Sequence, residues 1–125
     1  MDTVHQDIRP KTIICDIDGL LFRHCGDINT QHLSKPVLLA GVKEKFKEWD
    51  RKGYNIILMT GRRESTREYT EKQLTESGIF FDQLVMGVGG GVRVLINDRK
   101  EKGSGNTAVA INVVRNVEGL SNVDV

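Results

Sequence analysis

The sequence predicts an α/β fold built on a three-layer, Rossmann-like parallel sheet that carries no cap domain. Three apolar runs, at 13–18, 56–62 and 92–98, indicate this fold, and each of them ends in polar side chains. Long apolar runs without alternation are typical of strands that are covered on both faces. Open parallel sheets bind their ligands at the carboxyl ends of the strands. The three runs therefore predict both the fold and the edge of the sheet at which a site forms.

The composition is that of an ordinary globular protein. The chain has 125 residues, 38% of them hydrophobic and 28% charged, with a formal net charge of +1. This is enough for one core and offers no basic tract for nucleic acid. No stretch has the length of a membrane span, the N-terminus lacks the apolar core of a signal peptide, and the two cysteines form no disulfide framework. We place a polar lead-in at 1–10 and one domain at 11–125, and we expect a cytoplasmic protein with neither a membrane nor a nucleic-acid partner.

The first half of the chain predicts a strand, a loop and a helix. The strand is expected over 11–17, and a loop or short hairpin over 20–40, where glycine, asparagine and proline recur. The helix is expected over 41–52 and ends at Gly53. Three of its apolar side chains recur at helical spacing and are expected in the core: Val42, Phe46 and Trp49.

The second half predicts a strand over 54–60 and a helix over 64–77, whose apolar face is thin because it contains only Tyr69 and Leu74. Three short strands complete the prediction, at 83–86, 92–97 and 108–114. Parallel neighbours need a crossover of about a dozen residues, whereas only five residues separate the first two of these strands. The sequence therefore does not determine how the short strands pair within the sheet.

Two carboxylates follow the first apolar run directly. Asp16 and Asp18 are two residues apart, so a strand would point both side chains to the same side at its end. Like charges this close disfavour each other unless a cation or a shared proton intervenes. The structural alternative is a strand that runs into an Asp-Gly turn at Gly19. The pair therefore indicates either an ion-binding site or a turn.

Three short motifs together resemble those of the haloacid dehalogenase-like (HAD) superfamily of phosphotransferases, in particular its small capless phosphatases. The first family motif, Asp-x-Asp-Gly, is matched by residues 16–19, and the second, often Thr-Gly-Arg, by residues 60–62. The fourth, an acidic residue after an apolar strand, is matched by Asp98. The matched order spans residues 11–113, so the resemblance implies a HAD-like fold for most of the chain.

The resemblance implies that the first motif carries the chemistry. Asp16 would be the nucleophile that attacks phosphorus and forms an aspartyl-phosphate, so that hydrolysis proceeds in two steps. Asp18 would protonate the leaving oxygen and then deprotonate the attacking water. In the alternative interpretation, Asp16 is a structural carboxylate and Asp18 forms the turn.

The second motif would bind the phosphoryl group. The Thr60 hydroxyl and the Gly61 backbone N–H could each donate to a phosphoryl oxygen. Arg62 and Arg63 lie just beyond the strand end and could hold the anion of the substrate. One of these two arginines is expected to be a solvated surface charge.

The resemblance also implies a Mg²⁺ cofactor. Asp16 and Asp98 would supply its carboxylates, and the backbone carbonyl of Asp18 a third oxygen. Such oxygen ligands suit Mg²⁺, which would neutralise charge on the phosphoryl group. Asn97, where many relatives carry a second Asp, is either a further ligand or a structural partner.

One family motif has no counterpart, namely the lysine that usually precedes the fourth motif. Lys72 lies in the middle of a predicted helix, and Arg93 begins the strand that Asp98 ends, at the wrong edge of the sheet. Lys100 follows Asp98 by two residues and is expected to take this role, with Lys102 as the second choice.

These residues predict Mg²⁺-dependent hydrolysis of a phosphomonoester. A small phosphorylated metabolite such as a sugar phosphate is the expected substrate, as for many small capless relatives. One alternative is a phosphatase that acts on polynucleotide ends, and another is a HAD-fold binding module that lost its activity with the third-motif lysine. Residues 20–40 and 79–91 leave room for no cap domain, so a neighbouring subunit of a homo-oligomer could close the site.

Overall fold

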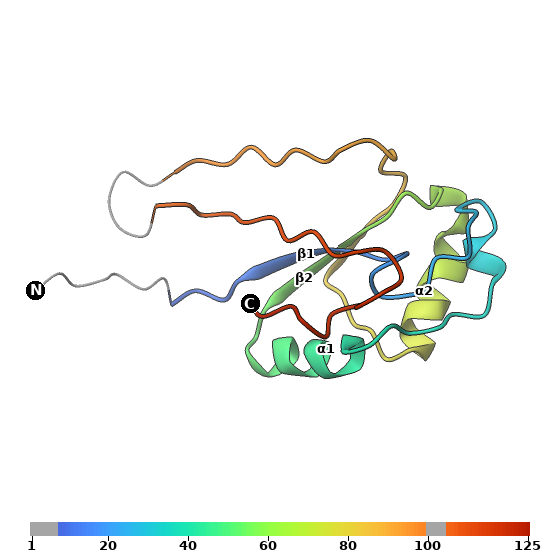
Figure 1. The fold of residues 1–125 in the computed structure, drawn as a ribbon, viewed down its shortest axis with the longest axis horizontal. Coiled ribbons are helices and arrows are strands. Elements are labelled where there is room, and N and C mark those ends of the chain that lie inside the picture. Colours follow the sequence, from blue (N-terminus) through green and yellow to red (C-terminus); the bar gives the residue numbers. More distant parts are fainter. Residues whose placement is uncertain (1–7, 100–104) are drawn as a thin grey trace, which may run out of the picture.

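Strands and helices alternate along the chain (Figure 1). The structure, a computed structural model, describes residues 8–99 and 105–125. Within these residues the elements are β1 (Thr12–Asp16), the 3-10 helix η1 (Gln31–Leu33), α1 (Val42–Arg51), β2 (Asn55–Met59), the 3-10 helix η2 (Glu64–Thr66), α2 (Arg67–Glu76) and β3 (Gln83–Val85). None of the helices in the described ranges combines the length and the apolar character needed to cross a membrane.

The sheet is parallel, with the strand order β1-β2-β3. Its register pairs Ile13 with Ile56 and Cys15 with Leu58, so the two apolar runs lie side by side. The chain passes through α1 between β1 and β2 and through α2 between β2 and β3, which gives each parallel pair the long crossover that it needs. The α/β class and the parallel sheet predicted from the sequence are confirmed.

The helix α1 contributes its predicted side chains to the core. Val42, Phe46 and Trp49 are each at most 2% exposed, and the ring centroids of Phe46 and Trp49 lie 5.1 Å apart. Beyond the helix, Gly53 takes a φ of 70°, which a residue with a Cβ rarely adopts. The helical spacing of the three apolar residues thus predicted the buried face of α1 correctly.

The helix α2 differs from the prediction because its inward face is largely polar. Thr70, Gln73 and Leu74 are buried, whereas Tyr69 is 55% exposed. The expectation that Tyr69 belongs to an apolar face is therefore wrong. Buried polar side chains need hydrogen-bond partners, and those of α2 lie in the candidate site.

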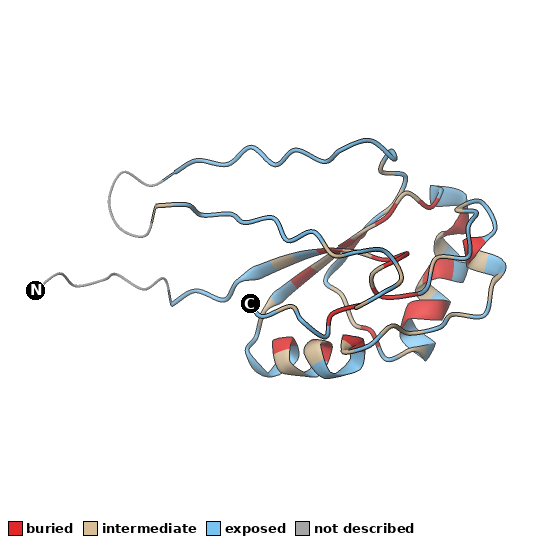
Figure 2. Cartoon of the chain, in the orientation of Figure 1, coloured by how far each residue is buried: buried red, intermediate tan, exposed pale blue. Residues whose placement is uncertain are grey.

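Burial alternates along the strands (Figure 2), so the two faces of the sheet are buried to different degrees. Cys15, Ile56 and Leu58 share one face and are at most 4% exposed. Ile14 and Val85 lie on the opposite face and are 49% and 42% exposed. Because side chains alternate along a strand, Asp16 belongs to this more open face, together with Ile14.

The strands expected at 92–97 and 108–114 are wrong, since both segments are coil that runs outside the sheet (Figure 1, orange and red). The loop that leaves β3 is rich in glycine and too short for a parallel crossover. The chain therefore cannot return beside the sheet in the same direction, and it runs away from it. Many apolar side chains of these segments are exposed, namely Val92, Val94, Leu95, Ile96, Val109, Ile111 and Val114.

Candidate active site

The turn after β1 places the two carboxylates of the first motif in different surroundings. The Phe22 N–H donates to the Ile17 carbonyl at 3.1 Å, and Gly19 takes a φ of 91° within this turn, a conformation that favours glycine. The chain thus reverses immediately after the strand. Asp16 stays on the open face of the sheet, whereas Asp18 is buried, with 8% of the residue exposed.

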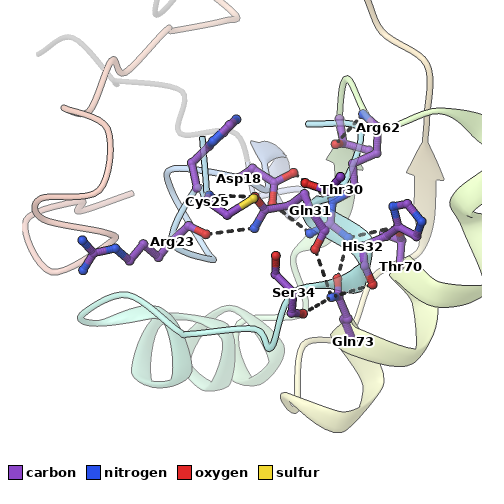
Figure 3. A network of polar contacts seen from close by, with 12 residues as sticks. Asp18, Arg23, Cys25, Thr30, Gln31, His32, Ser34, Arg62, Thr70 and Gln73 are labelled. Atoms are coloured by element: carbon purple, nitrogen blue, oxygen red, sulfur yellow. Dashed lines mark hydrogen bonds and ion pairs between the residues drawn. The ribbon is translucent and has the colours of Figure 1, made fainter. Parts of the chain in front are cut away.

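Asp18 forms a buried, bidentate ion pair with Arg62 (Figure 3). The Arg62 Nη2 group donates to Oδ1 at 2.8 Å, and the Nε group donates to Oδ2 at 2.9 Å. Only 1% of Arg62 is exposed. A buried charge without its partner is strongly destabilising, so each of the two residues makes the burial of the other possible.

The ion pair continues through α2 to the segment 31–34 (Figure 3). The Arg62 Nη1 group donates to Thr70 Oγ1 at 3.1 Å and also to Gln73 Oε1. The Gln73 Nε2 group in turn donates to three backbone carbonyls, at 3.3, 3.1 and 2.8 Å, those of Gln31, His32 and Ser34. We term Asp18, Arg62, Thr70 and Gln73 the buried network, since it connects the end of β1 to the loop between β1 and α1.

Thr60 and Gly61 lie at the end of β2, beside the first motif. Thr60 is 1% exposed, and its Oγ1 accepts the Arg62 N–H at 3.1 Å. A Cβ on Gly61 would lie 3.2 Å from the Val88 carbonyl oxygen. Glycine therefore allows the loop that follows β3 to pass close to the second motif.

The two arginines of this region face different surroundings. Arg62 commits its Nε, Nη1 and Nη2 groups to the buried network, whereas Arg63 is exposed. The expected orientation of Arg62 toward a substrate anion does not occur, because the polar face of α2 offers it partners inside the fold. Of the pair, Arg63 is accessible to an anion from solution.

Asp16 is the carboxylate that remains partly accessible at the end of β1. Burial raises its pKa above the ordinary value, and the nearby charge of Asp18 acts in the same direction. A hydrogen bond from the Ile17 N–H and the charges of Arg93 and Arg115 oppose this rise. No ion pair within residues 8–99 and 105–125 involves Asp16, so the charges of the two arginines act on it without a direct salt bridge.

Residues from the predicted strand at 92–97 are placed differently from the expectation. Arg93, expected at the far edge of the sheet, is near enough for its charge to act on Asp16. Asp98 is exposed, and its carbonyl accepts the Thr107 hydroxyl at 2.6 Å. The segment that carries Asp98 runs away from the end of β1 (Figure 1). The structure therefore does not bring Asp98 to Asp16, because the strand that would have placed it there does not form.

The described residues do not form the predicted metal cluster, and the two candidate lysines are not among them. No group of three or more His, Cys, Asp or Glu side chains that could hold a metal occurs in the part of the chain that the structure describes. Asn97 Nδ2 donates to Thr107 Oγ1 at 2.7 Å, as a structural partner. Lys100 and Lys102 lie outside the described residues.

Sequence reasoning missed three residues of this region. Thr70 and Gln73 complete the buried network, and the thin apolar face of α2 was the available signal for them. Arg115 lies against the turn after β1, since a Cβ on Gly19 would be 2.9 Å from its Cγ. No local pattern marks Arg115, because its neighbours in space are far away in the sequence.

Comparison with known proteins supports the fold. No protein-family model and no curated protein matches the sequence. Two structures of the Pnkp1/Rnl/Hen1 complex, one of them described as an RNA repair complex, contain a chain that is 33% identical to this one. Their TM-scores are 0.56 and 0.53, over 68% and 67% of this chain. A crystal structure from Vibrio cholerae is 21% identical, with a TM-score of 0.52 over 72% of this chain and 81% of its own.

The likeness to the RNA repair complex concerns one part of a larger protein. This chain covers 30% and 28% of the two matched chains. The comparisons therefore support the α/β fold.

Proposed function

We propose that this chain is a phosphatase that hydrolyses phosphomonoesters through Asp16. One observation carries the proposal: Asp16 is partly accessible and partly desolvated, and the charges of Arg93 and Arg115 act to lower its pKa, whereas Asp18 is held in an ion pair. A nucleophile beside cations at the carboxyl end of a parallel strand is well placed to meet a phosphate. The HAD-like fold supports the same chemistry at a coarse level.

The proposed reaction has two steps. In the first, an Asp16 carboxylate oxygen attacks phosphorus, the ester P–O bond breaks, and the leaving oxygen takes a proton from solvent. In the second, water attacks phosphorus, the bond between phosphorus and Asp16 breaks, and inorganic phosphate leaves. Thr60 and Gly61 are proposed to donate hydrogen bonds to the phosphoryl oxygens from the end of β2.

Asp18 takes a narrower role in this proposal than the resemblance implies. Both of its carboxylate oxygens accept hydrogen bonds from Arg62, so neither is placed to donate a proton to the leaving group. A carboxylate retains further lone pairs, and these could accept a proton from the water of the second step. Asp18 is thus proposed as a base and as the anchor of the buried network.

Mg²⁺ fits this site with Asp16 as its carboxylate ligand. Magnesium at phosphoryl-transfer sites is often held by one or two carboxylates together with substrate phosphate and water. Asp16 is accessible and partly desolvated, and the backbone carbonyl of Asp18 is close in the chain, whereas Asp98 lies elsewhere. When bound, the ion would supply charge neutralisation on the phosphoryl group.

The test is turnover of p-nitrophenyl phosphate with Mg²⁺ by the wild type and by Asp16→Asn. We expect the substitution to lower kcat by more than roughly 10⁴-fold, because it removes the nucleophile. The matched control is Asp50→Asn, an exposed carboxylate of α1, which should retain wild-type turnover. Activity of Asp16→Asn within a few-fold of the wild type would refute the mechanism, and no turnover by the wild type would favour an inactive binding module.

A second candidate substrate is a phosphate at an RNA end. The likeness to a chain of an RNA repair complex at 33% identity favours it over a small metabolite such as a sugar phosphate. Three exposed arginines, Arg63, Arg93 and Arg115, could also contact a polynucleotide backbone. The open site of a fold without a cap admits a large substrate.

Turnover of an RNA oligonucleotide with a terminal phosphate, compared with that of a sugar phosphate over a range of salt concentrations, separates these candidates. An RNA-end phosphatase should prefer the oligonucleotide and lose activity steeply as salt rises, because polynucleotide binding releases counterions. A preference for the sugar phosphate with a flat salt dependence would identify the small-metabolite enzyme.

A further inference from the structure

We propose that Arg115 is the residue that binds the phosphoryl oxygens of the substrate beside Asp16, in the role that the sequence assigns to Lys100. This inference rests on the proposed function and deepens it. It assigns the contact with the anion to Arg115, which follows the three sequence motifs in the chain and belongs to none of them.

The backbone of the first motif leaves room for this side chain. A Cβ on Gly19 would lie 2.9 Å from Arg115 Cγ and 3.5 Å from Arg115 Nε. The side chain therefore passes directly over the turn at Gly19, which follows the two carboxylates of the motif. Any residue other than glycine at this position would displace the arginine as well as strain a φ of 91°.

Asn116 holds the arginine in this place. Its N–H donates to the Gly19 carbonyl at 2.9 Å. Its side chain makes a reciprocal pair with the backbone of His24, accepting the N–H at 2.7 Å and donating to the carbonyl at 3.2 Å. Asn116 takes a φ of 61°, a left-handed conformation that asparagine tolerates better than most residues. Three hydrogen bonds thus fasten the segment to the loop after β1.

The charge of Arg115 is available to a ligand. Arg115 is exposed, and within the described ranges it takes part in no ion pair or side-chain hydrogen bond. Its charge acts to lower the pKa of Asp16, against the rise that burial causes. Arg62, by contrast, uses its guanidinium inside the fold, so it cannot serve the same purpose without breaking the buried network.

Arg115 is a better candidate than Arg93, which also acts on Asp16. Arg93 lies in the exposed coil after β3, whereas the neighbour of Arg115 is fastened directly to the first motif. Binding by a pre-positioned group loses less conformational entropy than binding by a mobile one. A guanidinium can also donate two parallel hydrogen bonds to a phosphoryl group, which suits a tetrahedral oxyanion.

The test compares the wild-type chain with Arg115→Met, Arg115→Lys and Arg115→Ala. Inorganic phosphate is titrated both as an inhibitor of p-nitrophenyl phosphate turnover and directly by calorimetry. Because charge-assisted hydrogen bonds are among the stronger ones, we expect Arg115→Met to weaken phosphate binding and to lower kcat/KM by roughly 10- to 100-fold. Arg115→Lys should retain part of both, and added guanidinium ion should restore part of the activity of Arg115→Ala.

The matched control is Arg51→Met, an exposed arginine at the end of α1, which should bind phosphate as the wild type does. Less than a threefold change in both phosphate affinity and kcat/KM in Arg115→Met, with the melting temperature unchanged, would overturn the inference while the effect of Asp16→Asn still stands. If Asp16→Asn keeps its activity, the mechanism fails. The calorimetric comparison then still decides whether Arg115 binds the anion.

Discussion

Asp16 and Asp18 leave the same strand two residues apart, yet they meet opposite surroundings. Asp18 turns into the fold, where Arg62 binds both of its oxygens and Gln73 connects the pair to the segment 31–34. Asp16 stays on the open face of the sheet, where the charges of Arg93 and Arg115 lower its pKa against the effect of burial. The comparison shows that one motif can supply a structural anchor and a reactive group at once, because the turn after the strand separates their environments.

The largest effect on stability is expected at the buried ion pair between Asp18 and Arg62. Arg62→Met removes the cation and leaves the Asp18 carboxylate buried without a partner, which should cost about 3–5 kcal/mol in the free energy of unfolding. Arg63→Met changes an exposed neighbour and should stay within about 0.5 kcal/mol of the wild type. Urea unfolding of both variants measures the difference, and equal stabilities would show that the buried ion pair does not hold the site together.

A smaller effect is expected at the far end of the buried network. Gln73→Ala removes the acceptor of one Arg62 N–H group and the side-chain donor to three carbonyls of the segment 31–34. We expect a loss of about 1–3 kcal/mol, together with faster amide exchange in this segment.

Lys72→Ala, at the adjacent and exposed position of α2, is the control for the change in helix propensity. If amide exchange near residue 31 were the same in both variants, Gln73 would not fasten the loop, and the buried network would end at α2.

The smallest effect on stability is expected at Asp16, where the substitution should stabilise the protein instead of destabilising it. Because the pKa of Asp16 is raised in the folded protein, its contribution to stability is complete below the ordinary value of 3.8 and is lost as the pH rises through the raised pKa. Asp16→Asn should therefore be more stable than the wild type at pH 7, and the difference should vanish in acid.

Urea unfolding of the metal-free proteins at several pH values measures this effect, with Asp50→Asn as the control. A variant that is less stable than the wild type at neutral pH would show that Asp16 is a structural carboxylate, and the contrast with Asp18 would disappear.

The parts of the fold that the sequence predicted are those governed by local spacing. The apolar run of β1 and the helical spacing of Val42, Phe46 and Trp49 each reflect neighbours in the chain, and the structure confirms them. The inward turn of Arg62 depends on Thr70 and Gln73, for which the thin apolar face of α2 is the only signal in the sequence. That Arg62 is the partner of both residues becomes evident only when the fold brings α2 beside it.

The errors in the site follow from errors in the sheet. Asp98 was expected beside Asp16, and Arg93 far from it, because 92–97 was expected to be a parallel strand. That segment instead leaves the sheet after a loop too short for a crossover, so it carries Asp98 away from the end of β1, whereas the charge of Arg93 acts on Asp16. Arg115 reaches the first motif through tertiary contacts alone, which sequence spacing does not encode.

The hydrogen bonds between His24 and Asn116 join residues that are 92 positions apart, so they close a long loop in the chain. Closing a loop of this length carries an entropic cost, and both hydrogen-bonded residues are only half-buried. Contacts of this kind are expected to form late in folding and to open early in local fluctuations. A phosphate held between the end of β1 and Arg115 would bind only the closed form, so it would shift this opening equilibrium toward closure. Slower amide exchange at Asn116 in the presence of phosphate would therefore report occupancy of the site without any turnover.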